Sequence, residues 1–339
     1  MRKKALPTIF ILLCLLIGVM ILSLCCGQIA IALNDMGAII LKHLGFLRSA
    51  KGSFTQEEDA VMWFIRMPRT IIGALVGAAL AISGTVMQGV FGNPLADPGL
   101  IGVSAGAATG AVLSIALGAT SLFSMPLFAF LGALGAIAIT VLLAMKHGKI
   151  PVMTLLLAGV AVGILLNALT SGVLTIMNEH KMQQYLFWMI GGLDFRRWEH
   201  VYIAVGPILI GGIVMVLLGR HLNILVLGEN EAKAVGMKVV PFRLCLLLVA
   251  SIITATAVCV SGNIGFVGLV IPHMMRMIVG PDHRVLIPAS ALAGAMFLVV
   301  CDTLGRVILP TTEIRVGIMT ALLGTPYFLY LLRNMKKIT

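Results

Sequence analysis

The residues of this chain that could do chemistry are few, and they do not form a catalytic set. The sequence has no G-x-x-x-x-G-K-[ST] phosphate loop, no H-E-x-x-H motif and no G-x-S-x-G motif. Its six cysteines show no C-x-x-C spacing, which argues against a metal site or a disulfide framework. His273 directly follows Pro272 at an expected helix end, where a structural role is favoured over metal ligation. We therefore expect no catalysis, no metal site and no cofactor bound by this chain itself.

Acidic residues inside apolar segments are almost absent. A carrier driven by protons or sodium usually buries acids near the membrane midplane, because its coupling ion needs ligands there. The nearest approach is Asp302 with Arg306, one helical turn apart, where an i,i+4 ion pair is possible. We expect this pair at the membrane surface, and we expect any transport to draw its energy from another subunit.

The composition of the chain identifies the elements that must position these residues. Of 339 residues, 60% are hydrophobic and 11% are charged, and the mean hydropathy is +1.08. Soluble domains carry about 25% charged residues. The apolar runs continue from end to end without a polar linker. We therefore predict an all-α integral membrane protein, with residues 1–339 forming one transmembrane domain.

Ten apolar runs are long enough to be considered as membrane-spanning helices, which need about 20 residues. The eighth run is short and ends at Pro272 and His273. The predicted spans are 8–33, 68–90, 99–118, 121–145, 151–177, 199–219, 242–262, 265–279, 286–305 and 314–333.

The charged residues orient these spans. With the N-terminus in the cytoplasm, the inner segments hold fourteen of the 24 basic residues but only four of the 13 acids. This is the sense expected from the positive-inside rule. The net charge of +11 therefore reflects topology and not nucleic-acid binding. We predict ten spans with both termini cytoplasmic.

Glycines recur at four-residue spacing within the predicted spans. Gly73 and Gly77 form one pair, and Gly102, Gly106 and Gly110 form a ladder. Small residues on one helix face let helix backbones approach closely in lipid. Tight packing is the favoured interpretation, with a pore-lining role as the alternative.

Several segments carry a family resemblance. They are R-M-P-R-T at 66–70, G-N-P-L-A-D-P-G at 92–99, W-M-I-G-G at 188–192, G-N-I-G-F-V-G-L-V-I-P-H at 262–273, D-T-L-G-R at 302–306 and E-I-R-V-G at 313–317. In type and order these segments resemble the FecCD family, the permeases for iron-siderophores, haem and vitamin B12 in type II ABC importers. The family's ten spans agree with the number counted above.

The resemblance implies partners for this chain. They are a second copy of the chain in a homodimer, two copies of an ABC ATPase that binds the ATP and Mg, and a periplasmic or lipid-anchored substrate-binding protein. It also implies that Arg66, Arg69 and Arg306 face the periplasm and pair with glutamates of that binding protein. A guanidinium fork suits carboxylates; the alternative for these residues is interfacial snorkelling.

The polar segment 222–239 resembles the coupling helix that sits in a groove of the ATPase. From the residues alone, a short helix starts near Glu229, has acids in its first turn and stops at Gly236. The predicted ATPase-coupling residues are Leu227, Gly228, Glu229, Ala232, Val235 and Gly236.

The segment 262–272 is rich in glycine and ends in proline, which predicts an interrupted helix. Such a break is explained either by packing or by a role in lining the transport path. The candidate path-lining residues are Gly262, Gly265, Phe266, Gly268 and Pro272. One departure from the family pattern is Arg315, which stands where the family commonly has proline. It removes a helix-start proline and puts the local geometry in doubt.

The predicted function is that of a permease subunit of an ATP-driven importer in the cytoplasmic (inner) membrane of a bacterium or archaeon. The cargo would be a metal chelate moved by alternating access, with ferric siderophore as the first choice and haem, cobalamin and molybdate behind it. The alternative is a secondary transporter that moves a small solute without an ATPase.

Overall fold

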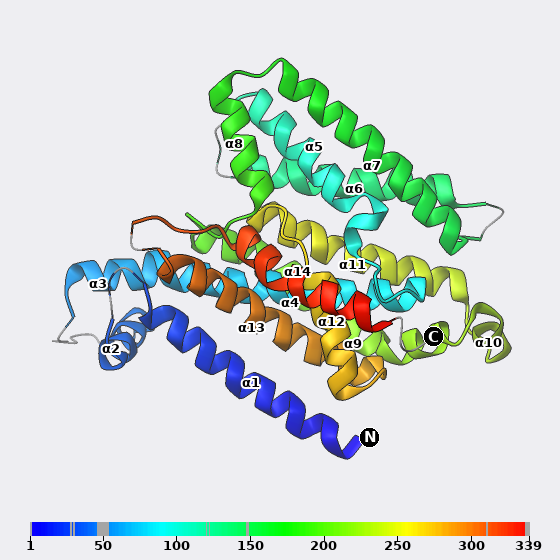
Figure 1. Ribbon diagram of the computed structural model, residues 1–339, viewed down its shortest axis with the longest axis horizontal. Coiled ribbons are helices and arrows are strands. Elements are labelled where there is room, and N and C mark those ends of the chain that lie inside the picture. The colour runs from blue at the N-terminus through cyan, green and yellow to red at the C-terminus, as the bar shows by residue number, and fades with distance from the viewer. Residues whose placement is uncertain are drawn as a thin grey trace.

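A computed structural model describes residues 2–27, 29, 31–45, 54–119, 121, 123–146, 149–309 and 311–335. Within these residues the protein is a bundle of helices joined by short loops (Figure 1). In chain order the helices are α1 (Arg2–Cys25), α2 (Leu33–His43), α3 (Gln56–Ala60), η1 (Val61–Arg66), α4 (Met67–Phe91), η2 (Pro98–Ile101), α5 (Val103–Ala116), α6 (Ser124–Ala144), α7 (Val152–Thr175), α8 (Glu179–Ile190), α9 (Trp198–Val226), α10 (Glu229–Ala234), α11 (Val239–Ser261), α12 (Val267–Val279), α13 (His283–Val307) and α14 (Val316–Met335).

The predicted helical membrane architecture is confirmed. In the part of the chain that the structure describes, seven helical segments are long and apolar enough to cross a membrane. Three shorter apolar helices, α5, α12 and α14, account for the remaining predicted spans. The α12 helix has 13 residues, which makes it about 20 Å long. This is shorter than the hydrocarbon layer of about 30 Å, so α12 reaches only part of the way across.

Three predicted spans have the wrong bounds. The first was predicted over 8–33, but α1 ends at Cys25 and the separate amphipathic helix α2 follows; residues 28 and 30 lie outside the described residues. The second begins earlier than predicted, because α3, η1 and α4 run continuously over Gln56–Phe91. The sixth extends to Val226. Apolar length alone does not show where a helix ends.

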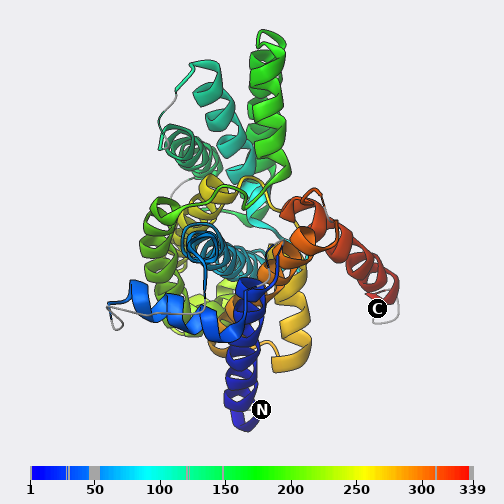
Figure 2. The same ribbon diagram turned by 90° about the vertical axis from the view of Figure 1, so that its left-hand side faces the viewer.

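The α4 helix is the centre of the bundle. It packs against α13, α9, α11 and α12, and most of its residues are buried. Viewed from the end where α3 lies, α4 occupies the middle while α1, α7 and α14 project at the periphery (Figure 2). The hydrophobic core is built around α4 and continues into α5, α6 and α9.

Glycines allow the helix backbones around α4 to touch. A Cβ atom placed on Gly77 would lie 2.2 Å from the carbonyl oxygen of Gly294 in α13, and one on Gly84 would lie 1.9 Å from the carbonyl oxygen of Gly268 in α12. The predicted packing role of the glycine ladder is confirmed at Gly106, whose added Cβ would lie 2.3 Å from the Gly132 carbonyl oxygen. Only a residue without a side chain fits at such crossings.

We expect Gly84→Ala to lower the free energy of unfolding by about 1–3 kcal/mol, because the new methyl group forces α4 and α12 apart. Gly265→Ala is the matched control, since a Cβ atom there meets nothing within 4 Å. Thermal unfolding of the detergent-purified variants measures the difference. Equal stability of the two variants would contradict the backbone contact.

The two ends of the bundle differ in character. Helices α1 and α14 both run between them, and the first and last described residues lie at the end that carries α10 (Figure 1). We call this the α10 end. The opposite end carries Arg66, Arg69 and Arg306, and we call it the arginine end. The cytoplasmic location predicted for both termini stays a prediction.

Candidate functional site

An ion-pair network lies at the arginine end, and Arg69 of α4 is its centre. The Arg69 Nε atom donates to both carboxylate oxygens of Asp302 at 3.0 Å, and Nη2 donates to Asp302 Oδ1 at 2.8 Å. Its Nη1 atom donates to Glu313 Oε2 at 2.7 Å. Asp194 Oδ1 lies 3.5 Å from Nη2. One guanidinium thus joins α4 to α13, to the segment before α14 and to the loop after α8.

Arg306 extends this network to the first helix. Its Nε atom lies 3.2 Å from Asp302 Oδ2, so the predicted i,i+4 ion pair is confirmed. Its Nη2 atom donates to the Ser23 hydroxyl oxygen at 2.6 Å and to the Ser23 carbonyl oxygen at 3.1 Å. The Ser23 hydroxyl in turn lies 3.1 Å from that of Thr70. These contacts hold the end of α1 against α13 and α4.

Arg66 has a different environment, because its partners are backbone carbonyls. Nη1 donates to the carbonyl oxygens of Leu24 at 2.9 Å and Cys25 at 3.2 Å, and Nη2 donates to that of Ile29. A cation beside the C-terminal carbonyls of a helix is favourable. Gly27 makes room for it, since a Cβ atom there would lie 2.4 Å from Arg66 Nη2.

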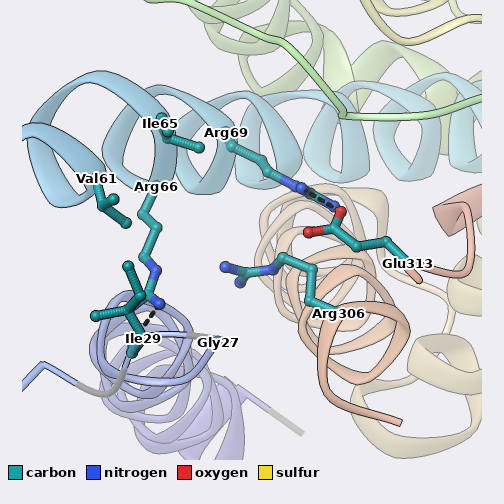
Figure 3. Close-up of a pocket in the computed structure, with 8 residues that line it drawn as sticks. All are labelled: Gly27, Ile29, Val61, Ile65, Arg66, Arg69, Arg306 and Glu313. Atoms are coloured by element: carbon teal, nitrogen blue, oxygen red, sulfur yellow. Dashed lines mark hydrogen bonds and ion pairs between the residues drawn. The ribbon is translucent and has the colours of Figure 1, made fainter. Parts of the chain in front are cut away.

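The three arginines line one pocket of about 210 Å³ (Figure 3). Glu313 is the acid among its lining residues. In Figure 3 the side chain of Glu313 lies between those of Arg69 and Arg306, and the Arg66 side chain points toward Ile29. Arg69 and Arg306 share the carboxylate of Asp302, so Arg66 is the cation of this pocket that has no carboxylate partner among the described residues. The positive charge left for an anionic group therefore lies mainly on Arg66.

The structure brings the three predicted docking arginines together but buries them, with 4%, 6% and 5% of Arg66, Arg69 and Arg306 exposed. Docking stays a prediction, and each arginine already has internal partners. The expected surface position of Asp302 is wrong, because this residue is 2% exposed. Asp194 and Glu313 are network members that sequence reasoning missed. No local sequence signal identified them, because their partner Arg69 is distant in sequence.

Arg315 does not disturb the start of α14. The helix begins at Val316, and the amides of Ile318 and Met319 donate to the Arg315 carbonyl oxygen at 3.0 and 3.3 Å. The guanidinium lies 4.5 Å from the centre of the Phe187 ring, and its Nη2 atom lies 3.4 Å from Asp194 Oδ2. The side chain therefore ties α14 to α8 where a proline could not.

We expect Arg315→Ala to lower the free energy of unfolding by about 1 kcal/mol, because it removes a cation–π contact and a partly exposed ion pair. Arg333→Ala, at an exposed position on the same helix, should leave stability unchanged. Thermal unfolding in detergent compares the two. If both variants unfold at the same temperature, the contacts of Arg315 do not stabilise the fold.

At the other end of the bundle, the predicted short helix is confirmed as α10. It spans Glu229–Ala234 with acids in its first turn, and Gly236 follows with a φ of 81°. Ala232 is buried against the bundle. Leu227 and Val235, on either side of α10, are 72% and 68% exposed. Two exposed apolar side chains in a polar segment form a surface suited to a partner protein.

A buried arginine connects α10 to the rest of this end. Arg243 of α11 donates from Nη2 to Glu229 Oε2 at 3.2 Å and from Nη1 to the Ile150 carbonyl oxygen at 2.7 Å. Ile150 lies two positions before the start of α7 at Val152. The chain of contacts therefore runs from α10 through Arg243 to the start of α7. Sequence reasoning missed Arg243.

The carboxyl of Glu229 is held in its charged form. A hydrogen bond from Lys233 at 2.7 Å, followed by the charge of Arg243, keeps the pKa of Glu229 below its ordinary value. For an acid with a lowered pKa, the stabilisation is complete above the ordinary value and is lost as the pH falls through the lowered one. The contact between α10 and α11 therefore weakens only in acid.

The interrupted helix is confirmed, because α11 ends at Ser261 and α12 begins at Val267. Phe266 has a φ of 69°, which is unusual for a residue with a side chain. Gly262, Gly268 and Pro272 are buried, and a Cβ atom on Gly262 would lie 2.2 Å from the Trp188 carbonyl oxygen. The close backbone contact of Gly262 favours packing for this residue, and the path-lining role of all three stays a prediction. It stays a prediction also for the exposed Gly265 and the half-buried Phe266.

The peripheral helices α7 and α14 leave apolar flanks uncovered, as α1 also does. In the most apolar stretch of α7 only 17% of the residues are buried. Leu157, Ile164 and Leu169 are among its exposed side chains. The flank of α14 forms a groove of about 610 Å³. This groove is lined by Ile190, Gly317, Ile318, Ala321, Leu322, Thr325, Pro326 and Leu329.

Comparison with known proteins gives a consistent result. The family model described as the FecCD transport family matches residues 14–334. The cobalamin import system permease protein BtuC of Halobacterium salinarum is 48% identical over 276 residues, covering 81% of this chain and 74% of that protein. The hemin transport system permease protein HmuU of Yersinia pestis is 40% identical, covering 91% and 93%.

A solved structure described as an inward-facing conformation of a metal-chelate type ABC transporter is also similar. It has a TM-score of 0.85 and 33% sequence identity, and the match covers 96% of this chain and 98% of that one. The similarity thus extends over nearly all the helices described above.

Proposed function

Because the chain belongs to the FecCD transport family, we propose that the polar clusters at its two ends are the places where an importer's other subunits act on it. The chain is a permease subunit of an ABC importer for metal chelates, and the ATPase is a separate subunit. The observation that carries the proposal is the contrast between a charged pocket at one end and an exposed apolar-edged helix at the other.

We assign the α10 end to the cytoplasm. The support is the excess of basic residues in the segments predicted to be cytoplasmic; of these residues, Lys336 and Lys337 lie outside the described part of the chain. The arginine end then faces the outside of the cytoplasmic membrane. Both termini are cytoplasmic in this assignment, and residues 1–339 act as one permease domain.

The apolar flanks of α7 and α14 support a homodimer. In a single copy these flanks meet lipid, and the groove along α14 is left empty of protein. We propose that two copies pack through these flanks and that the transported chelate passes between them, with Gly265 and Phe266 on its path. Two ATPase subunits then bind the two copies of segment 222–239.

The pocket at the arginine end supports docking of a substrate-binding protein. Arg69 and Arg306 already share the buried Asp302. Arg66, which lines the same pocket, is satisfied only by backbone carbonyls among the described residues. A glutamate from a binding protein could pair with Arg66 or Arg306 without displacing an internal carboxylate from Arg69. Arg69 itself serves to hold the network together.

The relatives named above support cobalamin or haem as the cargo, and cobalamin comes first because the protein with 48% identity carries that name. Both are planar macrocycles that hold a metal. The ferric siderophore predicted from the sequence remains a candidate without support from these relatives.

The test is uptake into liposomes that hold the permease with its ATPase. We expect radiolabelled cyanocobalamin to enter only when ATP and the binding protein are both present. Labelled haem and a ferric hydroxamate siderophore serve as the competing cargoes. Uptake of the siderophore alone would overturn the choice of cargo but leave the importer intact.

A matched experiment separates the importer from a stand-alone carrier. Liposomes holding only the permease receive a proton or sodium gradient without ATPase or ATP. We expect no uptake, because the acid buried in α13, Asp302, is already held by Arg69 and Arg306 and is not free to bind a coupling ion. Gradient-driven uptake would overturn the proposed function.

A further inference from the structure

A second pocket opens at the α10 end. Its volume is about 510 Å³, within the range of sites that bind ligands or side chains of a partner. The pocket is bordered by the ends of α4, α9 and α12 and by the start of α13. Its lining residues are Gln88, Gly89, Gly92, Asn93, Pro94, Asn223, Val226, Leu227, Arg276, Pro281, Asp282 and His283.

Arg276 is the cation of this pocket, and it lacks a counter-charge. Its side chain is half-buried, yet it makes no hydrogen bond or ion pair with any residue that the structure describes. A guanidinium removed from water costs free energy unless an acceptor replaces its hydration. A half-buried arginine in a pocket therefore calls for an acidic group, and the described part of the chain does not provide one.

Asp282 is the acid that lines the same pocket, but its carboxylate is already occupied. Arg284 donates to it from Nη2 at 2.6 Å and from Nε at 2.9 and 3.1 Å, and Asn223 Nδ2 donates to Oδ1 at 2.7 Å. The hydrogen bonds from Arg284 hold the pKa of Asp282 well below its ordinary value. The Asp282 carboxylate is thus bound by Arg284 and Asn223, and it does not neutralise Arg276.

Other polar side chains that line this pocket are also held by hydrogen bonds. The Asn223 oxygen accepts from the His283 amide at 2.9 Å and lies 2.8 Å from His283 Nδ1. Gln88 donates from Nε2 to the Leu269 carbonyl oxygen at 3.1 Å. The pocket is therefore bordered by side chains with defined positions, which is a condition for specific recognition.

The position of the pocket indicates the source of the missing acid. Its walls are helix ends and the turns at 92–94 and 281–282, rather than the apolar flanks that face lipid. Leu227 belongs both to the pocket and to segment 222–239, where we place the ATPase. A protein bound to α10 would therefore also cover the pocket.

We propose that the pocket receives an acidic side chain of the partner ATPase and that this carboxylate pairs with Arg276. This gives the ATPase a second contact beside α10, formed by the ends of α4, α9 and α12. The inference rests on the proposed function, since it requires that an ATPase bind at this end.

The test measures binding of the ATPase subunit to the purified full-length permease in neutral-lipid nanodiscs. We expect Arg276→Gln to weaken binding by roughly 30-fold or more, the loss typical of removing one partner of a buried charge pair. Arg276→Lys should weaken it less. Arg220→Gln is the matched control, because Arg220 is an exposed arginine near the same end of α9, and its binding should stay within about twofold of wild type.

A rescue identifies the acid. Aspartates and glutamates on the permease-facing surface of the ATPase are changed to lysine one at a time, and one of these changes should restore binding of Arg276→Glu. Equal binding by Arg276→Gln and Arg220→Gln would overturn the proposal. So would an effect of Arg276→Gln that appears only in nanodiscs with anionic lipid, since a lipid phosphate would then be the partner. If the wild-type permease binds no ATPase at all, the proposed function itself fails.

Discussion

Asp302→Asn is expected to lower the free energy of unfolding by about 3–5 kcal/mol, the cost of breaking a buried ion pair by removing one partner. Asparagine has nearly the same shape as aspartate, so the change removes charge without creating a cavity. Arg69 and Arg306 would both lose the carboxylate that they share at 2.8–3.2 Å. Thermal unfolding in detergent, or the fraction of folded protein recovered from membranes, measures the loss.

Glu313→Gln is the control for this prediction. Glu313 also pairs with Arg69, at 2.7 Å, but its side chain is 35% exposed. Water can therefore replace part of the interaction between the Glu313 carboxylate and Arg69. The expected loss in the free energy of unfolding is about 1 kcal/mol. If Asp302→Asn and Glu313→Gln had the same free energy of unfolding, the buried carboxylate of Asp302 would not be the main source of the network's stability.

Arg243→Met is expected to reduce ATP-driven uptake by about tenfold or more while the ATPase still binds. Methionine removes both hydrogen bonds that connect Glu229 of α10 to the Ile150 carbonyl oxygen before α7. Movement of α10 would then no longer be passed to the start of α7. A coupling free energy of 1–3 kcal/mol between two sites corresponds to a change of about 5- to 150-fold.

The control is Lys233→Met, which removes the other partner of Glu229 but leaves the contact with Ile150 intact. Uptake by this variant should stay close to that of wild type. Thermal unfolding must be measured for both variants, because an unpaired Ile150 carbonyl also costs stability. Equal uptake by folded Arg243→Met and Lys233→Met would show that Arg243 does not transmit motion.

Much of the architecture was predictable because it depends on local properties of the chain. Apolar length identified ten segments, and the positions of glycine identified α10 and the break before α12. The bounds of α1 and α4 were not predictable in the same way. The end of α1 depends on Arg66, which binds its last carbonyls from 42 residues away. No local pattern reports such a contact.

The state of the arginines was the least predictable feature. The sequence placed Arg66, Arg69 and Arg306 at helix ends, where arginine is commonly exposed. Whether each is exposed depends on acids far away in sequence. Arg69 and Asp302 are separated by 233 positions and still form a bidentate contact. The i,i+4 spacing revealed Asp302 with Arg306, but only the fold brings Arg69 and Glu313 to the same place.

The contact between Ser23 and Arg306 has a consequence for how the protein is made. The two residues are 283 positions apart, so the first helix enters the membrane long before its polar partner is synthesised. Until α13 arrives, the end of α1 lacks the guanidinium that later binds its Ser23 carbonyl. A chain that stops before α13 therefore lacks this contact, and the end of its first helix keeps a polar group without its guanidinium partner.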